Sequence, residues 1–173
     1  MKRLGLGMLA ALVLLAACSG PPAELEDPDL VALFQAINEL RASGGRCPSG
    51  EMDPVDPLRL FGPIIIAAQH HAEDLAAAGV LSHESPAGSR YYPPGSGPLD
   101  RLRREGCACL RVAENLAEAG SWRQALSAWQ ASTDGHCEAL FDVHPETGKR
   151  LGLTAAGLGH VGRYWVLDMA RPR

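Results

Sequence analysis

The sequence has no run of basic residues, few aromatic side chains and, after its first residues, no long apolar stretch. Aromatic residues make up 5% of the 173 residues, and the formal net charge is −4. Because a dedicated nucleic-acid-binding protein carries a positive patch, that function class is not expected. Hydrophobic residues make up 46% of the chain. This is enough to bury the core of one domain, so a largely disordered chain is not expected either.

Three catalytic or metal-binding motifs are also missing. His70 and His71 lie on a predicted helix without an H-E-x-x-H pattern, so we expect His71 to pack partly buried and His70 to be solvated. No G-x-S-x-G elbow occurs, and Ser82 and His83 would point to opposite sides of an extended segment, which disfavours a hydrolase triad with Glu114. The absence of paired C-x-x-C motifs disfavours a cysteine-based zinc site.

The first residues have the pattern of an export signal. Two positive residues precede an apolar run from Leu4 to Ala17, which is too short to span a bilayer comfortably and is followed by Cys18. The end of this run, Leu-Ala-Ala-Cys, resembles the lipobox of bacterial lipoproteins. We therefore expect residues 1–17 to be a lipoprotein signal peptide, Cys18 to be acylated, and residues 18–29 to form a tether. The alternative is a plain signal peptide in which Cys18 is incidental.

This signal predicts an exported protein that is anchored to the membrane on its periplasmic or extracellular side. In a Gram-negative cell the outer membrane is favoured, because Ser19 rather than Asp follows the lipidated cysteine. Residues 30–170 remain for a single folded domain. No second apolar run in the sequence reaches spanning length, so the lipid anchor is the expected membrane contact.

Apolar spacing predicts helices and strands in an order that indicates an α+β fold. The predicted helices cover 28–43, 64–78 and 121–132, with shorter helical segments at 100–105 and 138–141, and the predicted strands cover 110–119, 151–158 and 164–169. A capping-box pair, Ser121 and Gln124, marks the start of the clearest helix. The long loop over 81–99 is either functional or mobile. Its Tyr91 and Tyr92 are candidates for a ligand lid or a membrane contact, although aromatic residues more often pack onto their own domain.

The polar motifs, taken in chain order, resemble the CAP superfamily (cysteine-rich secretory, antigen 5 and pathogenesis-related proteins), in particular its small bacterial members. The resemblance runs from Leu30 to Ala170 and rests on the order of the motifs, since each is weak alone. The matching segments are LFQAINELR at 33–41, I-x-x-A-A-x-x-H-A-x-D-L at 64–75, Ser82-His83, AENLA at 113–117, W-x-x-S at 129–132, Gly135-His136-Cys137 and Tyr164-Trp165. The resemblance implies a three-layer α/β/α sandwich with a small antiparallel sheet between the helices.

The resemblance also implies a shallow cavity lined by His83, Glu114 and His136. Ser132 lies near the place of a second family glutamate, and His136 is one residue further from Trp129 than in common bacterial members, so this chain departs from the family set. Two imidazoles and a carboxylate suit zinc, and a metal-free set held by hydrogen bonds is the other interpretation. Beside both rings, Glu114 would favour charged imidazolium, so that the charge of the cavity changes near neutral pH.

The four cysteines after Cys18 are expected to pair in an oxidising compartment, and they allow three connectivities. A bond between Cys107 and Cys109 would close a very tight ring. The resemblance implies the pair Cys47–Cys137, which closes a loop of about 90 residues and contributes several kcal/mol in the chain-entropy model. In the family Cys107 and Cys109 have no usual partner, and bonding to each other, free thiols and a link to another chain all stay open.

The expected function is noncatalytic binding at the cell envelope, of a lipid, another hydrophobic molecule or an envelope ligand, through the His/Glu cavity or an adjacent groove. A hydrolase that uses His83, Glu114 and His136, with or without a divalent metal such as zinc, is the alternative. A structural or adhesion role of the surface alone is the third. An enzyme would lose turnover in His83→Ala, whereas a groove binder would lose its ligand when apolar wall residues change.

Overall fold

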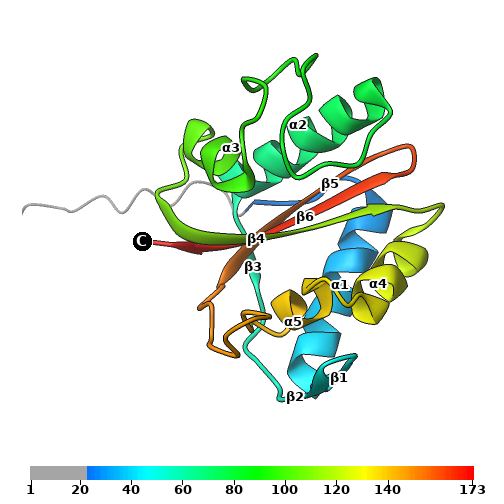
Figure 1. Ribbon diagram of the computed structural model, residues 1–173, viewed down its shortest axis with the longest axis vertical. Helices are drawn as coiled ribbons and strands as arrows, with labels where there is room; N and C mark the ends of the chain where they lie inside the picture. The colour runs from blue at the N-terminus through cyan, green and yellow to red at the C-terminus, as the bar shows by residue number, and fades with distance from the viewer. Residues whose placement is uncertain (1–22) are drawn as a thin grey trace, which may run out of the picture.

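The computed structural model describes residues 23–173, so the predicted signal peptide and the lipidation site Cys18 lie outside the described residues. Figure 1 shows three layers, in which a sheet lies between two layers of helices. One layer contains α2 (Gly62–Ala78) and α3 (Pro98–Arg104), and the other contains α1 (Pro28–Ser43), α4 (Trp122–Ala131) and α5 (His136–Leu140). The predicted three-layer α+β sandwich is confirmed.

The central sheet has the strand order β3-β5-β6-β4. Its strands are β3 (Arg59–Leu60), β4 (Cys109–Glu118), β5 (Ala155–Val161) and β6 (Tyr164–Pro172). β6 is antiparallel to both of its neighbours, whereas the short β3 is parallel to β5. The expectation of a wholly antiparallel sheet is therefore wrong at this edge. The chain passes through α2, α3, β4, α4 and α5 between β3 and β5, and parallel pairing requires such a long crossover.

A separate hairpin of β1 (Gly45–Cys47) and β2 (Gly50–Met52) lies apart from the sheet, beyond the end of α1 (Figure 1). Neither this hairpin nor β3 was predicted from the sequence. Strands of two or three residues are too short to show the alternation by which a strand is recognised.

The three main helices begin and end close to the predicted positions. The carboxylate of Asp27 caps α1 by accepting a hydrogen bond from the Asp29 amide at 2.9 Å. α2 ends at Gly79, whose φ of 66° is a left-handed conformation that glycine adopts without strain. Ser121 caps α4, but the side chain of Gln124 accepts from the Gly120 amide, so the reciprocal bond of the capping box is shifted by one residue. Within residues 23–173, no helix is long and apolar enough to cross a membrane.

β5 begins four residues later than predicted. The segment before it is irregular because Asp142 binds it from both its backbone and its side chain: the Leu151 amide donates to the Asp142 carbonyl at 2.9 Å, and the Leu153 amide donates to the Asp142 carboxylate at 2.6 Å. At the other end β5 continues to Val161, where a four-residue connection was expected. The connection to β6 is therefore a tight turn at 162–163.

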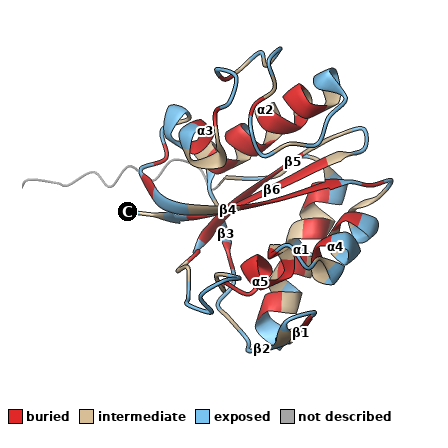
Figure 2. Cartoon of the chain, in the orientation of Figure 1, coloured by how far each residue is buried: buried red, intermediate tan, exposed pale blue. Residues whose placement is uncertain are grey.

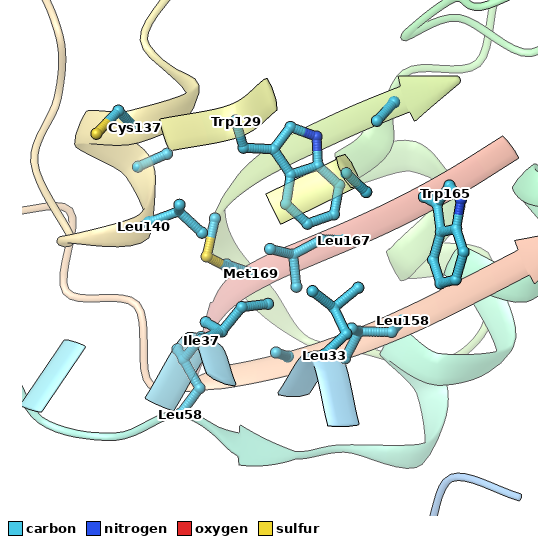
Figure 3. Close-up of a cluster of buried hydrophobic side chains, with 14 of the residues drawn as sticks. Leu33, Ile37, Leu58, Trp129, Cys137, Leu140, Leu158, Trp165, Leu167 and Met169 are labelled. Atoms are coloured by element: carbon cyan, nitrogen blue, oxygen red, sulfur yellow. The ribbon is translucent and has the colours of Figure 1, made fainter. Parts of the chain in front are cut away.

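The larger hydrophobic core lies between the sheet and the layer of α1, α4 and α5. On β6, Trp165, Leu167 and Met169 point into this core, and Figure 3 shows them together with Leu33 and Trp129. The intervening residues of β6 face α2 and α3, as the alternation of side chains along a strand requires. Figure 2 shows that the middle of the sheet is buried. A polar side chain on the face toward α2 and α3 is therefore removed from water.

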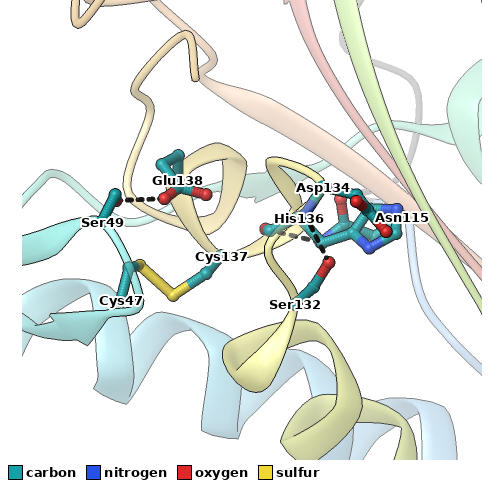
Figure 4. The surroundings of a disulfide bond; sticks show 8 residues. All are labelled: Cys47, Ser49, Asn115, Ser132, Asp134, His136, Cys137 and Glu138. Carbon is teal, nitrogen blue, oxygen red and sulfur yellow. Dashed lines mark hydrogen bonds between the residues drawn. A yellow bond between two sulfur atoms is a disulfide. The ribbon is translucent and has the colours of Figure 1, made fainter. Parts of the chain in front are cut away.

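The expected disulfide between Cys47 and Cys137 is confirmed, with Cα atoms 5.7 Å apart. It joins β1 to α5 in the neighbourhood of His136 (Figure 4). Cys107 and Cys109 are bonded to each other, with Cα atoms 5.1 Å apart, which is one of the three outcomes that the sequence leaves open. Two disulfides are typical of a protein that folds in an oxidising compartment.

Candidate functional site

A buried arginine on α3 holds two parts of the candidate site together. Arg101 has no exposed surface, and its guanidinium donates to the Glu114 carboxylate on β4 and, at 2.9 Å, to the backbone carbonyl of His83. It also donates to the Ser96 carbonyl at 2.7 Å. No local pattern in the sequence marks Arg101 as a site residue, because an arginine in a short basic helix is usually solvated.

Both oxygens of Glu114 are engaged. Oε1 is 2.8 Å from Nδ1 of His83, Oε2 accepts from Arg101, and the side chain is 1% exposed. Burial alone would raise the pKa of Glu114, but the hydrogen bond from His83 and the charge and hydrogen bond of Arg101 outweigh it, so the pKa of this carboxyl is lowered. Glu114 is therefore an ionised group that orients the ring of His83.

His71 on α2 lies close to this group and is fully buried. Its Nε2 is 2.9 Å from the Ser82 carbonyl and 4.0 Å from Oε2 of Glu114. Burial is the main cause that lowers the pKa of His71, and it outweighs the opposite effect of Glu114, so the ring is neutral and donates to Ser82. The Ser82 hydroxyl accepts from the Glu84 amide at 3.0 Å. Among residues 23–173, no hydrogen bond joins this hydroxyl to the ring of His83, whose Nδ1 is directed at Glu114, so the two do not form a nucleophile–base pair.

His136 is the first residue of α5 and follows Gly135, whose φ of 90° turns the chain into the helix. The side-chain amide of Asn115 on β4 donates to the His136 carbonyl at 3.0 Å (Figure 4). The ring centroids of His83 and His136 are 6.2 Å apart, with the planes tilted by 44°. Both residues, with Glu114, line a cavity of about 240 Å³. The structure thus brings together the two histidines and the glutamate that the motifs assign to one cavity.

Burial and the charge of His83 lower the pKa of His136, although Asp134 and Glu138 act in the opposite direction. The expectation that Glu114 favours the charged form of both rings is therefore wrong for His136. The reason is that the carboxylate of Glu114 is directed at His83, and that its negative charge is offset by the positive charge of Arg101. His136 presents a neutral imidazole to the cavity at neutral pH.

Ser132 lies outside the residues that line this cavity. It ends α4, and its hydroxyl accepts from the Asp134 amide at 3.0 Å (Figure 4). The additional residue between Trp129 and His136 is accommodated in this turn, so Ser132 is a turn residue and not a cavity residue. Asp134, which the sequence analysis does not single out, lines the cavity instead.

Asp168 is a buried carboxyl that no sequence motif points to. It lies on β6 opposite Glu114 in the register of β4 and β6, and it has no exposed surface. Neither oxygen has a hydrogen-bond partner of good geometry among residues 23–173. Burial and the charge of Glu114 raise the pKa of Asp168 well above its usual range, so this carboxyl keeps its proton to a higher pH than an exposed aspartate does. The sequence signal is an acidic residue inside the otherwise apolar strand VLDMA.

The long loop after α2 packs onto that helix. The ring of His70 stacks on Tyr91 with centroids 3.8 Å apart, so the expectation that His70 is solvated is wrong. Tyr92 is buried and donates to Glu105 at 2.8 Å, while the Arg90 amide donates to Asp74 at 2.8 Å. Both tyrosines therefore pack on their own domain. These contacts fix the loop whose first residues carry His83.

The residues expected to bind zinc do not fit a metal centre. In the part of the chain that the structure describes, no group of three or more His, Cys, Asp or Glu side chains could hold a metal ion. Both oxygens of Glu114 are taken by His83 and Arg101, and the fixed charge of Arg101 opposes a cation at that carboxylate. The arrangement is a hydrogen-bonded set, and no metal-dependent step follows from it.

Comparison with known proteins identifies the fold. No protein-family model and no curated protein sequence matches the chain. An extracellular protein containing an SCP domain from Bacillus anthracis superposes with a TM-score of 0.63 at 20% identity, over 82% of this chain and 39% of that one. An outer surface protein from Borrelia burgdorferi gives 0.60 at 17% identity, over 84% and 93%. A cysteine-rich secretory protein from Staphylococcus aureus gives 0.55 at 14% identity, over 82% and 38%.

These similarities confirm the CAP-like fold that the motifs predict. The chain spans 39% of the Bacillus protein and 38% of the Staphylococcus protein, but 93% of the Borrelia protein. At identities of 20% or less the similarity establishes the fold alone. The function has to be argued from the site of this chain.

Proposed function

We propose that this protein is a CAP-type binding module that is exported, anchored at the cell envelope through Cys18, and binds a ligand in the His83–His136 cavity without converting it. The observation that carries the proposal is the state of Glu114. Its carboxylate is buried, ionised and occupied by Arg101 and His83. It is therefore not free to take a proton from a substrate or to attack one.

The fixed wall of the cavity supports binding. The Glu114 carboxylate fixes the ring of His83 by a hydrogen bond to Nδ1, and the Arg101 guanidinium fixes the backbone of His83 by donating to its carbonyl. His136 precedes Cys137, whose disulfide ties α5 to β1. Groups that are already fixed lose little entropy when a ligand arrives. Because the side chain of His83 is 54% exposed, its ring is open to a ligand from solvent.

Purification of the full chain from membranes of an exporting cell tests the binding proposal. Molecules released by denaturation are identified by mass spectrometry for the wild type, His83→Gln and His136→Gln. Ser132→Ala is the matched control, because Ser132 is close in sequence but outside the cavity. We expect an organic molecule with the wild type and the control, and about tenfold less with either histidine variant. No bound molecule, or equal amounts in all four proteins, would contradict the proposal.

Export and anchoring are supported by the lipobox-like end of the apolar run and by two disulfides. Two of the structural neighbours are described as an extracellular protein and an outer surface protein. Metabolic labelling with palmitate should label the wild-type chain and leave Cys18→Ala unlabelled. An unlabelled wild-type chain in the membrane fraction would argue against the anchor.

A hydrolase is the second candidate, and one observation favours it. Burial and the neighbouring His83 keep the imidazole of His136 neutral, and a neutral imidazole can act as a general base. A screen of ester, amide and glycoside substrates separates the two functions. Turnover that is lost in His136→Gln but kept in Ser132→Ala would favour the hydrolase, and its absence in the wild type would favour binding.

A further inference from the structure

A second hollow of about 420 Å³ adjoins the His83–His136 cavity. The two share three lining residues, Val112, His144 and Leu151, so they lie side by side along one wall. The hollow lies where α3 and β4 face the loop that follows α5. We call it the basic groove and define it by six of its lining residues: Leu99, Arg111, Val112, Lys149, Arg150 and Leu151.

The charge of the basic groove is opposite to that of the chain. Arg111, Lys149 and Arg150 line the groove and no acidic side chain does, although the net charge of the chain is −4. Among residues 23–173, Arg111 and Lys149 form no ion pair, and the carboxylate nearest to Arg150 is Asp142 at 3.9 Å. Three like charges around one hollow repel each other, and a bound anion relieves this repulsion.

The cations are partly held in position by the backbone. The guanidinium of Arg111 lies 3.4 Å from the Arg150 carbonyl and 3.3 Å from the Leu151 carbonyl. The guanidinium of Arg150 donates to the Phe141 carbonyl at 3.3 Å. The planar guanidinium of an arginine can donate two parallel hydrogen bonds to the paired oxygens of a phosphate or a carboxylate. The side chains of Arg111 and Arg150 therefore suit an anionic head group.

The remaining surface of the groove is apolar. Leu99, Val112 and Leu151 are half-buried side chains from α3, β4 and the loop before β5. Two of them, Val112 and Leu151, also line the His83–His136 cavity. The apolar surface therefore continues from the cations into that cavity. A ligand that is only charged leaves this surface in water, and a neutral lipid leaves the cations without a counter-charge.

We propose that the basic groove binds a single-chain anionic amphiphile, with its phosphate or carboxylate on Arg111, Lys149 and Arg150 and its apolar chain on Leu99, Val112 and Leu151. The inference rests on the proposed function, because it names the class of ligand that extends from the groove into the His83–His136 cavity.

Calorimetric titration with four probes tests the chemistry of the ligand. The protein is the full chain with Cys18→Ser, so that no acyl group is attached. The probes are dodecyl phosphate, dodecanoate, dodecyltrimethylammonium and inorganic phosphate, each below its micelle concentration. We expect one or both anionic amphiphiles to bind at least about tenfold more tightly than the cationic amphiphile and inorganic phosphate. The tighter of the two anions identifies the head group. Equal binding of anionic and cationic amphiphiles, or no binding of either anion, overturns the inference.

Charge-removing variants locate the site. Arg111→Gln and Lys149→Gln should each weaken binding of the anionic amphiphile about tenfold. Arg103→Gln is the matched control, because Arg103 is exposed on α3 and does not line the groove. This variant should bind the anionic amphiphile with the affinity of the wild type. A thermal melt of each variant establishes that it is folded. Wild-type affinity in both groove variants, or an equal loss in the control, overturns the inference.

Lys149 provides a second readout, since the only other lysine of the sequence is Lys2. Dodecyl phosphate or dodecanoate should slow acetylation of Lys149 by an amine-reactive ester about tenfold at saturation, as measured by peptide mass spectrometry. An unchanged acetylation rate under saturating amphiphile overturns the inference.

The two proposals fail separately. If the histidine variants lose the co-purified molecule while neither anionic amphiphile binds, the inference fails and the proposed function stands. If the anionic amphiphiles bind and protect Lys149 while the histidine variants lose nothing, the groove stands and the cavity function fails.

Discussion

The ion pair of Arg101 and Glu114 places two charges in a region that water does not reach. The penalty for desolvating both is offset only while each has its partner, so loss of one partner costs about 3–5 kcal/mol. We predict that Arg101→Met lowers the free energy of unfolding by about this amount, and that adding Glu114→Leu restores most of the loss. Urea unfolding followed by tryptophan fluorescence measures both.

Arg103→Met is the control for this pair, because Arg103 is exposed on the same helix, and it should change stability by less than about 0.5 kcal/mol. A double variant as unstable as Arg101→Met alone would show that the arginine acts through packing and not through the ion pair.

Asp168 leads to a prediction about pH. Its pKa is raised in the folded protein by burial and by Glu114, whereas in the unfolded chain it is about 3.9. Between these two values unfolding releases a proton, so its contribution to stability is complete below pH ~4 and is lost as pH rises toward the folded value. Asp168→Asn removes this dependence, because the amide is close to the carboxyl in size and does not titrate.

In urea unfolding from pH 4.5 upward, the stability of the wild type should therefore fall relative to Asp168→Asn by about 1.4 kcal/mol per pH unit. The difference levels off above the folded pKa. Parallel stability curves for the two proteins would mean that Asp168 is ionised in the folded state.

Local motifs identify part of the candidate site at the scale of residues. His83, Glu114 and His136 each lie in a short polar pattern, and the structure places them around one cavity. Arg101 and Asp168 carry no such pattern. Their roles come from contacts between different elements, from α3 to β4 across two layers and from β6 to β4 within the sheet. Sequence spacing alone does not determine which strand lies opposite which.

At the scale of elements, the close approach of α2 to the sheet depends on glycine. A Cβ atom on Gly157 of β5 would lie 2.2 Å from the backbone of Ile64, so α2 would have to move. Overpacking of this kind costs about 1–3 kcal/mol or more. We predict that Gly157→Ala lowers the melting temperature by several degrees, about 2–4 °C for each kcal/mol.

Gly62→Ala is the matched control, because a Cβ atom at this first residue of α2 meets no atom within 4 Å. Its melting temperature should equal or exceed that of the wild type, as measured by circular dichroism. An unchanged melting temperature in Gly157→Ala would mean that α2 adjusts its position without cost.

Element boundaries were predictable where a local interaction sets them. Asp27, Gly79 and Ser121 each mark a helix end through a cap or a left-handed turn. The start of β5 was not predictable in the same way. Its delay to Ala155 depends on Asp142, which lies 11 residues before Leu153 and binds the segment that precedes the strand, and no local pattern marks this contact.

At the scale of the whole molecule, one disulfide links parts that are 90 residues apart. In the chain-entropy model such a loop contributes about 4–5 kcal/mol, whereas the ring of Cys107 and Cys109, two residues apart, contributes only about 1–2 kcal/mol. We predict that Cys47→Ser with Cys137→Ser lowers the free energy of unfolding by the larger amount. The matched pair Cys107→Ser with Cys109→Ser should lower it by the smaller amount. Guanidinium unfolding of the wild type and the two double variants measures the difference.

The loss of the long-range disulfide should also affect the cavity. Because His136 adjoins Cys137, the double substitution Cys47→Ser with Cys137→Ser should weaken ligand retention at a temperature where the protein is still folded. Equal losses of stability in the two pairs would mean that local packing, and not the length of chain enclosed, determines what the long-range disulfide contributes.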